Sequence, residues 1–369
     1  MGFNTHPVDS NSDDVLQNKE YVLPGKIQYN NVVLESNNFG YYHYPVFGSI
    51  YDAFYQGDIV SISTNPTNTP WLTYCRPSYI NSMPSADDNR KIYLNGLCVR
   101  ILEQRANGDM KISIRWNDFN IKNNVRWCGD IVLNEKVIVK PNCTVLLDHG
   151  LSPTRPVNPI VFNGHKIFTS PTVFTANGGS EFIIDASGKL ELKNNSSYVA
   201  TSNSSLHIQD NGLCIIDPGS TLILKAECNL NIVGKGKIII KSGGYLCVEQ
   251  GANINLQDYN SLIVLEEGAI LGANPNLLSS TNCSATITKN GNGSIINYGQ
   301  DVYIQNETLS MSRYIGGKNI FIGNNVTAGK PSGNVLINNG AGVIFDCREI
   351  VLDAGFECAA GASFEVKNH

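Results

Sequence analysis

The middle of the chain repeats every eight residues, which constrains the fold more than any other feature. From Lys189 to Leu265 the second and fourth positions of each block are apolar or nearly so, as in Cys214 and Ile216. Such a pair is the inward side of a short β-strand, and the last three positions, such as Asp210-Asn211-Gly212, have turn chemistry. Strands this short with three-residue corners predict a β-solenoid. An ordinary sandwich with accidental phasing is disfavoured, because weaker blocks extend the register back to Val173.

The third position of each block, which points outward, indicates how many blocks close one coil. If three blocks of eight make a coil, two of the three stacked columns are mainly apolar and one is wholly polar. A two-block coil would mix apolar and polar residues in each column. The sequence therefore predicts a three-sided β-solenoid (β-helix) with eight residues per face. The columns are Glu191, Ile215, Ile239 and Ile263, then Val199, Ile223 and Cys247, then His207, Asn231 and Asn255.

The two apolar columns form a candidate interaction face, because apolar residues that point outward are normally covered. We predict that they pack on another domain or another protein chain. The alternative is that β-branched residues merely fit exposed strands. The proposed face consists of Ile215, Ile239, Ile263, Val199, Ile223 and Cys247.

The ten cysteines suggest no metal site, since no CxxC pair or Cys/His spacing typical of zinc is present. A shift of three blocks carries Cys214 onto Leu190 and Ile238, and no two cysteines of the repeat stack on each other. We therefore expect most of the thiols to be free and to serve as small hydrophobic groups.

The segments on either side of the repeat differ from it. Around Arg105-Ala106-Asn107-Gly108-Asp109, two strands of period two flank a hairpin signal, which favours an antiparallel sandwich. At the other end, short alternating strands from Asn334 to Val366 indicate further solenoid that caps the first. The predicted all-β organisation is a polar segment 1–25, a β-sandwich-like accessory domain 26–125, a β-solenoid 126–270 and an irregular then capping segment 271–369.

Composition excludes several classes of protein. The 34 glycines, with abundant asparagine, suit turns and argue against a helical bundle. A net charge of −5 with scattered Lys and Arg argues against nucleic acid as a partner. No run of 18 apolar residues is present and the N-terminus is polar, so we expect a chain that does not span a membrane and carries no export signal of its own.

Three stretches resemble a known family. Ser49 to Asn68, Ile92 to Trp116 and Arg126 to Thr154 look like the region downstream of the catalytic domain in secreted metalloproteases of the immune-inhibitor-A type from Bacteroidetes. The resemblance implies an accessory β-domain, in some members followed by a β-solenoid, and an exported or cell-envelope location. None of the six histidines belongs to a His-Glu-x-x-His motif, so zinc proteolysis is not assigned to this chain.

Charged residues of the repeat do not form a recognisable catalytic set. Under the three-block coil, Lys193, Asp217 and Lys241 share a column, and alternating charge of this kind is typical of a solvated ladder. We predict no catalytic residue, cofactor or metal.

The function favoured by these patterns is a non-catalytic, exported or cell-surface scaffold or binding protein, related to the accessory region of a secreted metalloprotease. Its expected partner is a protein or domain on the apolar faces, and a carbohydrate partner is left open. The alternative is a carbohydrate-active parallel β-helix, a polysaccharide lyase or hydrolase with an unrecognised site.

Overall fold

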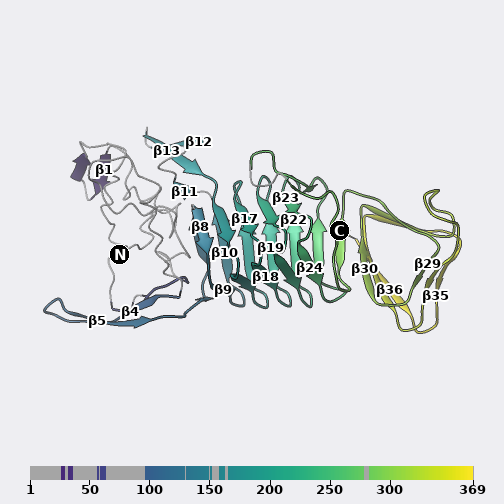
Figure 1. Ribbon diagram of the computed structural model, residues 1–369, viewed down its shortest axis with the longest axis horizontal. Helices are drawn as coiled ribbons and strands as arrows, with labels where there is room; N and C mark the ends of the chain where they lie inside the picture. Colours follow the sequence, from purple (N-terminus) through teal and green to yellow (C-terminus); the bar gives the residue numbers. More distant parts are fainter. Residues whose placement is uncertain are drawn as a thin grey trace.

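The computed structural model shows an all-β chain built mainly from a parallel β-solenoid (Figure 1). It describes residues 26–29, 32–35, 56–57, 59–63, 96–128, 130–148, 150–151, 158–162, 165–277 and 282–368.

Three parallel sheets form the three sides of the main solenoid, and we name the outward side of each. The junction face belongs to β7 (Val125–Cys128), β10 (Thr144–Asp148), β16 (Lys189–Leu192), β19 (Leu213–Ile216), β22 (Lys237–Ile240), β25 (Leu262–Leu265) and β27 (Ser294–Asn297). The strap face belongs to β8 (Asp130–Leu133), β14 (Val173–Ala176), β17 (Ser197–Ala200), β20 (Thr221–Leu224), β23 (Tyr245–Val248) and β26 (Ile270–Leu271). The amide face belongs to β6 (Asn120–Ile121), β9 (Lys136–Val139), β15 (Glu181–Ile184), β18 (Ser205–Ile208), β21 (Asn229–Ile232) and β24 (Asn253–Leu256).

The register of the strands confirms the predicted three-sided coil. The chain passes once through each sheet per coil, so β16 pairs with β19 and β19 pairs with β22. Leu190 stacks on Cys214 and Cys214 stacks on Ile238, as expected for three blocks of eight. In the four-residue strands from β14 to β25, the inward residues at the second and fourth positions are fully or almost fully buried and form one continuous hydrophobic core.

Aromatic rings fill the core at the end of the solenoid nearest the N-terminal strands. The rings of Trp127 and Tyr198 lie on either side of Phe174, with centroids 5.9 and 4.9 Å away, and Phe182 meets Phe174 edge-on. Corners between strands use residues that tolerate positive φ, among them Asn211 at 59°. The abundance of asparagine and glycine thus follows from the number of corners.

One extra residue interrupts the repeat between β24 and β25, and it changes the predicted orientation of one side chain. The interval from Asn253 to Leu262 is nine residues instead of eight. Ile263 consequently stacks on Ile238 in the core and is fully buried there, while Val264 takes the outward position. The prediction that Ile263 points outward is wrong, because a shift of one residue moves a strand's side chains to the opposite face.

A second, smaller three-sided solenoid follows the first and contains three coils. This confirms that the C-terminal segment continues as solenoid. Its sheets are β28 (Val302–Ile304), β31 (Asn319–Ile322) and β34 (Glu349–Leu352); β29 (Glu307–Leu309), β32 (Val335–Ile337) and β35 (Phe356–Cys358); and β30 (Arg313–Gly316), β33 (Gly342–Asp346) and β36 (Ser363–Lys367).

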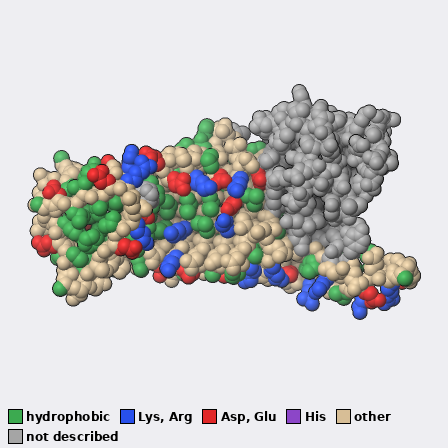
Figure 2. Space-filling model, turned by 180° about the vertical axis from the view of Figure 1, so that it is seen from behind, with side chains coloured by type: hydrophobic (Ala, Val, Ile, Leu, Met, Phe, Trp, Pro, Cys, Tyr) green, Lys and Arg blue, Asp and Glu red, His purple; other side chains and the backbone are tan. Residues whose placement is uncertain are grey.

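The last coil of the smaller solenoid leaves apolar side chains in solvent. Phe364 and Val366 stack on the buried Val343 and Phe345, yet they are 39% and 46% exposed. A hydrophobic patch is visible at this end of the molecule (Figure 2). The described chain therefore covers the core at this end incompletely.

Antiparallel strands accompany the start of the main solenoid. The predicted hairpin around Asn107-Gly108 is confirmed, with Gly108 at a φ of 91°. Most of the predicted sandwich-like domain lies outside the described residues, and β6 already belongs to the solenoid. The antiparallel strands are β1 (Lys26–Tyr29), β2 (Val32–Glu35), β3 (Ile59–Val60), β4 (Cys98–Gln104), β5 (Met110–Arg115), β11 (Gly150–Leu151), β12 (Asn158–Phe162) and β13 (His165–Ser170).

Candidate functional site

An insertion between β26 and β27 crosses the strap face and covers one of the two apolar columns. We call the described residues of this insertion, 272–277 and 282–293, the strap. Val199, Ile223 and Cys247 project outward from β17, β20 and β23, but none of them is more than 6% exposed. Leu277 and Cys283 of the strap pack against them. These three residues of the predicted interaction face are therefore covered by their own chain.

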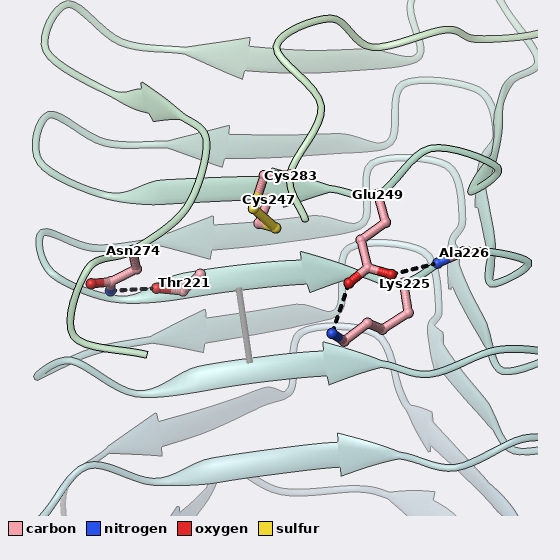
Figure 3. Close-up of a disulfide and its surroundings, with 7 residues drawn as sticks. All are labelled: Thr221, Lys225, Ala226, Cys247, Glu249, Asn274 and Cys283. Atoms are coloured by element: carbon pink, nitrogen blue, oxygen red, sulfur yellow. Dashed lines mark hydrogen bonds and ion pairs between the residues drawn. A yellow bond between two sulfur atoms is a disulfide. The ribbon is translucent and has the colours of Figure 1, made fainter. Parts of the chain in front are cut away.

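A disulfide fastens the strap to the solenoid (Figure 3). It joins Cys247, on β23, to Cys283, which lies 36 residues further along the chain. Beside it, the backbone N–H of Ser284 donates a hydrogen bond to the carbonyl of Val248 at 2.7 Å. The strap thus continues the hydrogen bonding of the solenoid at the point where it is cross-linked.

Most cysteines in the described part of the chain are free thiols, as expected from the repeat. Burial raises the pKa of Cys214 and Cys228 to about 12, so both thiols stay protonated and unreactive near pH 7. Among the described side chains, the free cysteines are Cys98, Cys143, Cys214, Cys228, Cys347 and Cys358.

A buried asparagine anchors the first part of the strap. The Asn274 side-chain amide donates a hydrogen bond to the Thr221 hydroxyl at 2.8 Å (Figure 3). It also donates to the Gly219 carbonyl at 3.2 Å. Its side-chain oxygen accepts a hydrogen bond from the backbone of Asn276 at 3.0 Å. One side chain therefore fixes both the local turn and its position on β20.

Replacing this anchor should loosen the strap without unfolding the solenoid. Asn274→Ala removes three hydrogen bonds from a buried position and should lower the free energy of strap opening by about 2 kcal/mol. Hydrogen exchange of the strap amides measures this change. Asn276→Ala is the matched control, because that side chain is exposed and should leave exchange unchanged. Equal exchange in the two variants would contradict the anchoring role of Asn274.

The second apolar column, on the junction face, is covered only near the smaller solenoid. Ile215 and Ile239 are half-buried. The next two outward residues toward the smaller solenoid, Val264 and Ile296, are buried. The residues that close over this end are Tyr298, Tyr314 and Ile344.

A carboxylate connects the aromatic residues at this junction. Asp346, on β33, accepts hydrogen bonds from the Tyr314 hydroxyl and, at 2.9 Å, from the Tyr298 hydroxyl. Burial, together with these bonds to Asp346, raises the pKa of both tyrosines. The hydroxyls remain protonated donors, and the site links the two solenoids.

Three outward carboxylates of the repeat are engaged by lysines. Rows of acidic and basic side chains run along the solenoid (Figure 2), with Lys241 2.8 Å from Asp217 and Lys225 2.7 Å from Glu249. Glu249 also accepts a hydrogen bond from the backbone of Ala226 (Figure 3).

The same pairing holds at Glu191. Burial raises the pKa of this carboxyl, but its hydrogen bonds and attraction to Lys189 and Lys193 outweigh burial, and the net shift is downward. These contacts keep the carboxylate ionised, which is the opposite of what a general acid needs at neutral pH.

The described residues contain no group of three or more His, Cys, Asp or Glu side chains placed to hold a metal ion. Nor does this part of the chain contain a helix long and apolar enough to cross a membrane.

Comparison of the chain with protein-family models, curated proteins and solved structures finds no match. The structure defines the class of protein as an all-β, three-sided parallel solenoid. The resemblance to the metalloprotease accessory region stays a prediction.

Proposed function

We propose that this protein is an exported, non-catalytic scaffold whose solenoid holds a binding surface in a rigid array. The observation that carries this proposal is the regular solenoid with a strap clamped by Cys247–Cys283. Stacked coils contact only their neighbours, so they supply an extended and stiff surface. Proteins keep structural disulfides mainly in oxidising compartments, which supports a location outside the cell or in the cell envelope.

The redox state of the strap in its native setting tests this location. The protein is recovered from its source cells in the presence of a thiol-alkylating reagent, and its peptides are mapped by mass spectrometry. We expect the peptides that carry Cys247 and Cys283 to be joined, while Cys358, an exposed free thiol, is alkylated. Alkylation of both Cys247 and Cys283 would contradict an oxidising compartment.

The finer proposal is that the chain is an accessory region related to a secreted metalloprotease. It is supported only by the three resembling stretches near the start of the chain. The reading frame upstream of Met1 tests it. A His-Glu-x-x-His motif on that frame supports an accessory region, whereas a signal peptide directly before Met1 indicates a free-standing surface protein.

A polysaccharide lyase or hydrolase is the competing function. Such an enzyme needs carboxylates and a basic group available to the substrate. The carboxylates of Glu191, Asp217 and Glu249 are instead engaged with lysines. We expect no release of reducing or unsaturated sugar ends from polysaccharides incubated with the purified protein, and measurable release would favour the enzyme.

A further inference from the structure

The amide face differs from the other two sides of the main solenoid. The strap covers the apolar column of the strap face, and the smaller solenoid covers one end of the junction face. On β18, β21 and β24 the outward side chains are all partly or fully exposed. These strands follow one another along one side of the molecule (Figure 1). The outward residues are Ser205, His207, Asn229, Asn231, Asn253 and Asn255.

Hydrogen bonds between coils order the side chains of this face. The Asn253 amide donates to the Asn229 side-chain oxygen at 3.3 Å, and the Asn231 side-chain nitrogen lies 3.4 Å from Nδ1 of His207. A primary amide has two N–H groups and a carbonyl oxygen with two lone pairs, so one bond within the ladder leaves donors and acceptors for a ligand. The face therefore presents ordered donors and acceptors together.

The six outward positions carry no formal charge near neutral pH. Five are Ser or Asn. Burial lowers the pKa of His207, Glu181 raises it by less and Lys136 lowers it further, so the ring is neutral at pH 7. A neutral surface offers no charge attraction to an acidic or basic polymer. Its chemistry instead complements hydroxyl groups, which donate and accept hydrogen bonds in the same way.

The corner between β24 and β25, which contains the extra residue of the repeat, borders the amide face and carries a tyrosine. This corner is tied to the equivalent corner of the previous coil, between β21 and β22. Asp258 accepts a hydrogen bond from the Gly234 N–H at 2.7 Å, and the Ser261 hydroxyl donates to the Gly234 carbonyl at 3.1 Å. Between these two residues Tyr259 is 37% exposed. The exposed part of a tyrosine ring is an apolar platform with a polar tip.

We propose that the amide face, from His207 to Asn255 with Tyr259 at its edge, is a binding site for an uncharged polysaccharide. Sugar hydroxyls hydrogen bond to the amides, and the tyrosine ring packs against the apolar side of a sugar ring. The site gives the proposed scaffold its ligand class and rests on that proposal for its biological setting.

Affinity electrophoresis of the full chain tests the site with three neutral polymers, mixed-linkage β-glucan, galactomannan and pullulan, and with alginate as an anionic comparison. We expect at least one neutral polymer to retard the protein and alginate to leave it unaffected. Asn255→Leu and Tyr259→Ala should each weaken the association constant by about tenfold, equivalent to the loss of one net interaction. Asn338→Leu, a partly exposed asparagine after β32, is the matched control and should bind as the wild type.

Circular dichroism confirms that each variant is folded before its binding is measured. Retardation by none of the neutral polymers, retardation by alginate alone, or binding that Asn255→Leu and Tyr259→Ala leave unchanged overturns the proposal. Such a failure is distinct from failure of the scaffold proposal, which depends on the redox state of Cys247 and Cys283 and on the absence of sugar release.

Discussion

Leu230→Asn is expected to destabilise the main solenoid by about 4 kcal/mol. Leu230 is a fully buried inward residue of β21, stacked between Leu206 and Ile254. The substitution removes roughly 2 kcal/mol of apolar burial and leaves an amide without partners, which costs about 2 kcal/mol more. Both neighbouring coils lose their contact with this position, because each coil of a solenoid is stabilised mainly by the coils next to it.

Urea unfolding followed by circular dichroism measures this effect, and the adjacent residue provides the control. The control, Asn231→Leu, is the reverse substitution on the same strand. The Asn231 side chain points outward and is half-buried. We expect its stability to stay within about 0.5 kcal/mol of the wild type, as is usual for surface substitutions. Similar losses in the two variants would show that β21 does not have the inward and outward sides described here.

The eight-residue period of the sequence predicted the solenoid because each block repeats the same local pattern of strand and corner. Apolar residues at two alternating positions, followed by a corner, determine both the strand and the side of it that is buried. The polarity of the third position then distinguished a three-sided from a two-sided coil, as the register of Cys214 on Leu190 shows. These features are local or repeat at a fixed interval, so no knowledge of distant contacts was required.

The repeat left two features of the structure unpredicted, an inserted residue and the contacts of residues outside the repeat. Ile263 was assigned to the wrong side of its strand because the nine-residue interval before it preserves an alternating apolar pattern, with Leu262 and Val264 also apolar. Cys283 lies in an insertion with no register, so stacking arithmetic could not pair it with Cys247. The signal that remained was the apolar outward column itself, which indicated a cover but not whether the cover belonged to the same chain.

The amide face illustrates the same limit at a candidate binding site. The wholly polar column of His207, Asn231 and Asn255 was visible in the sequence. The sequence did not show that this column lies on the uncovered face, because the cover of each face depends on where the strap and the smaller solenoid lie. Tyr259 likewise lies in the corner that contains the extra residue, which Asp258 and Ser261 tie to Gly234 of the previous coil.

Cys283→Ser is expected to lower the free energy of strap opening by about 4 kcal/mol. The disulfide closes a loop that spans 36 residues, and the loss of chain entropy on closing a loop of this size accounts for a stabilisation of this order. Without the cross-link, Leu277 and the polar contacts of Asn274 must hold the strap on Val199 and Ile223. The core of the solenoid lies on the other side of the sheet and should keep its own stability.

Hydrogen exchange at the Ser284 amide, which donates to the Val248 carbonyl, reports strap opening directly. We expect its exchange to accelerate roughly a thousandfold in Cys283→Ser, with the same change in wild-type protein reduced by a phosphine, while amides of β18 and β21 exchange at their original rates. Cys358→Ser removes an exposed free thiol and serves as the control. An unchanged rate at Ser284 in both Cys283→Ser and the reduced protein would mean that packing alone holds the strap. Acceleration throughout the solenoid would instead make the disulfide part of the stability of the whole fold.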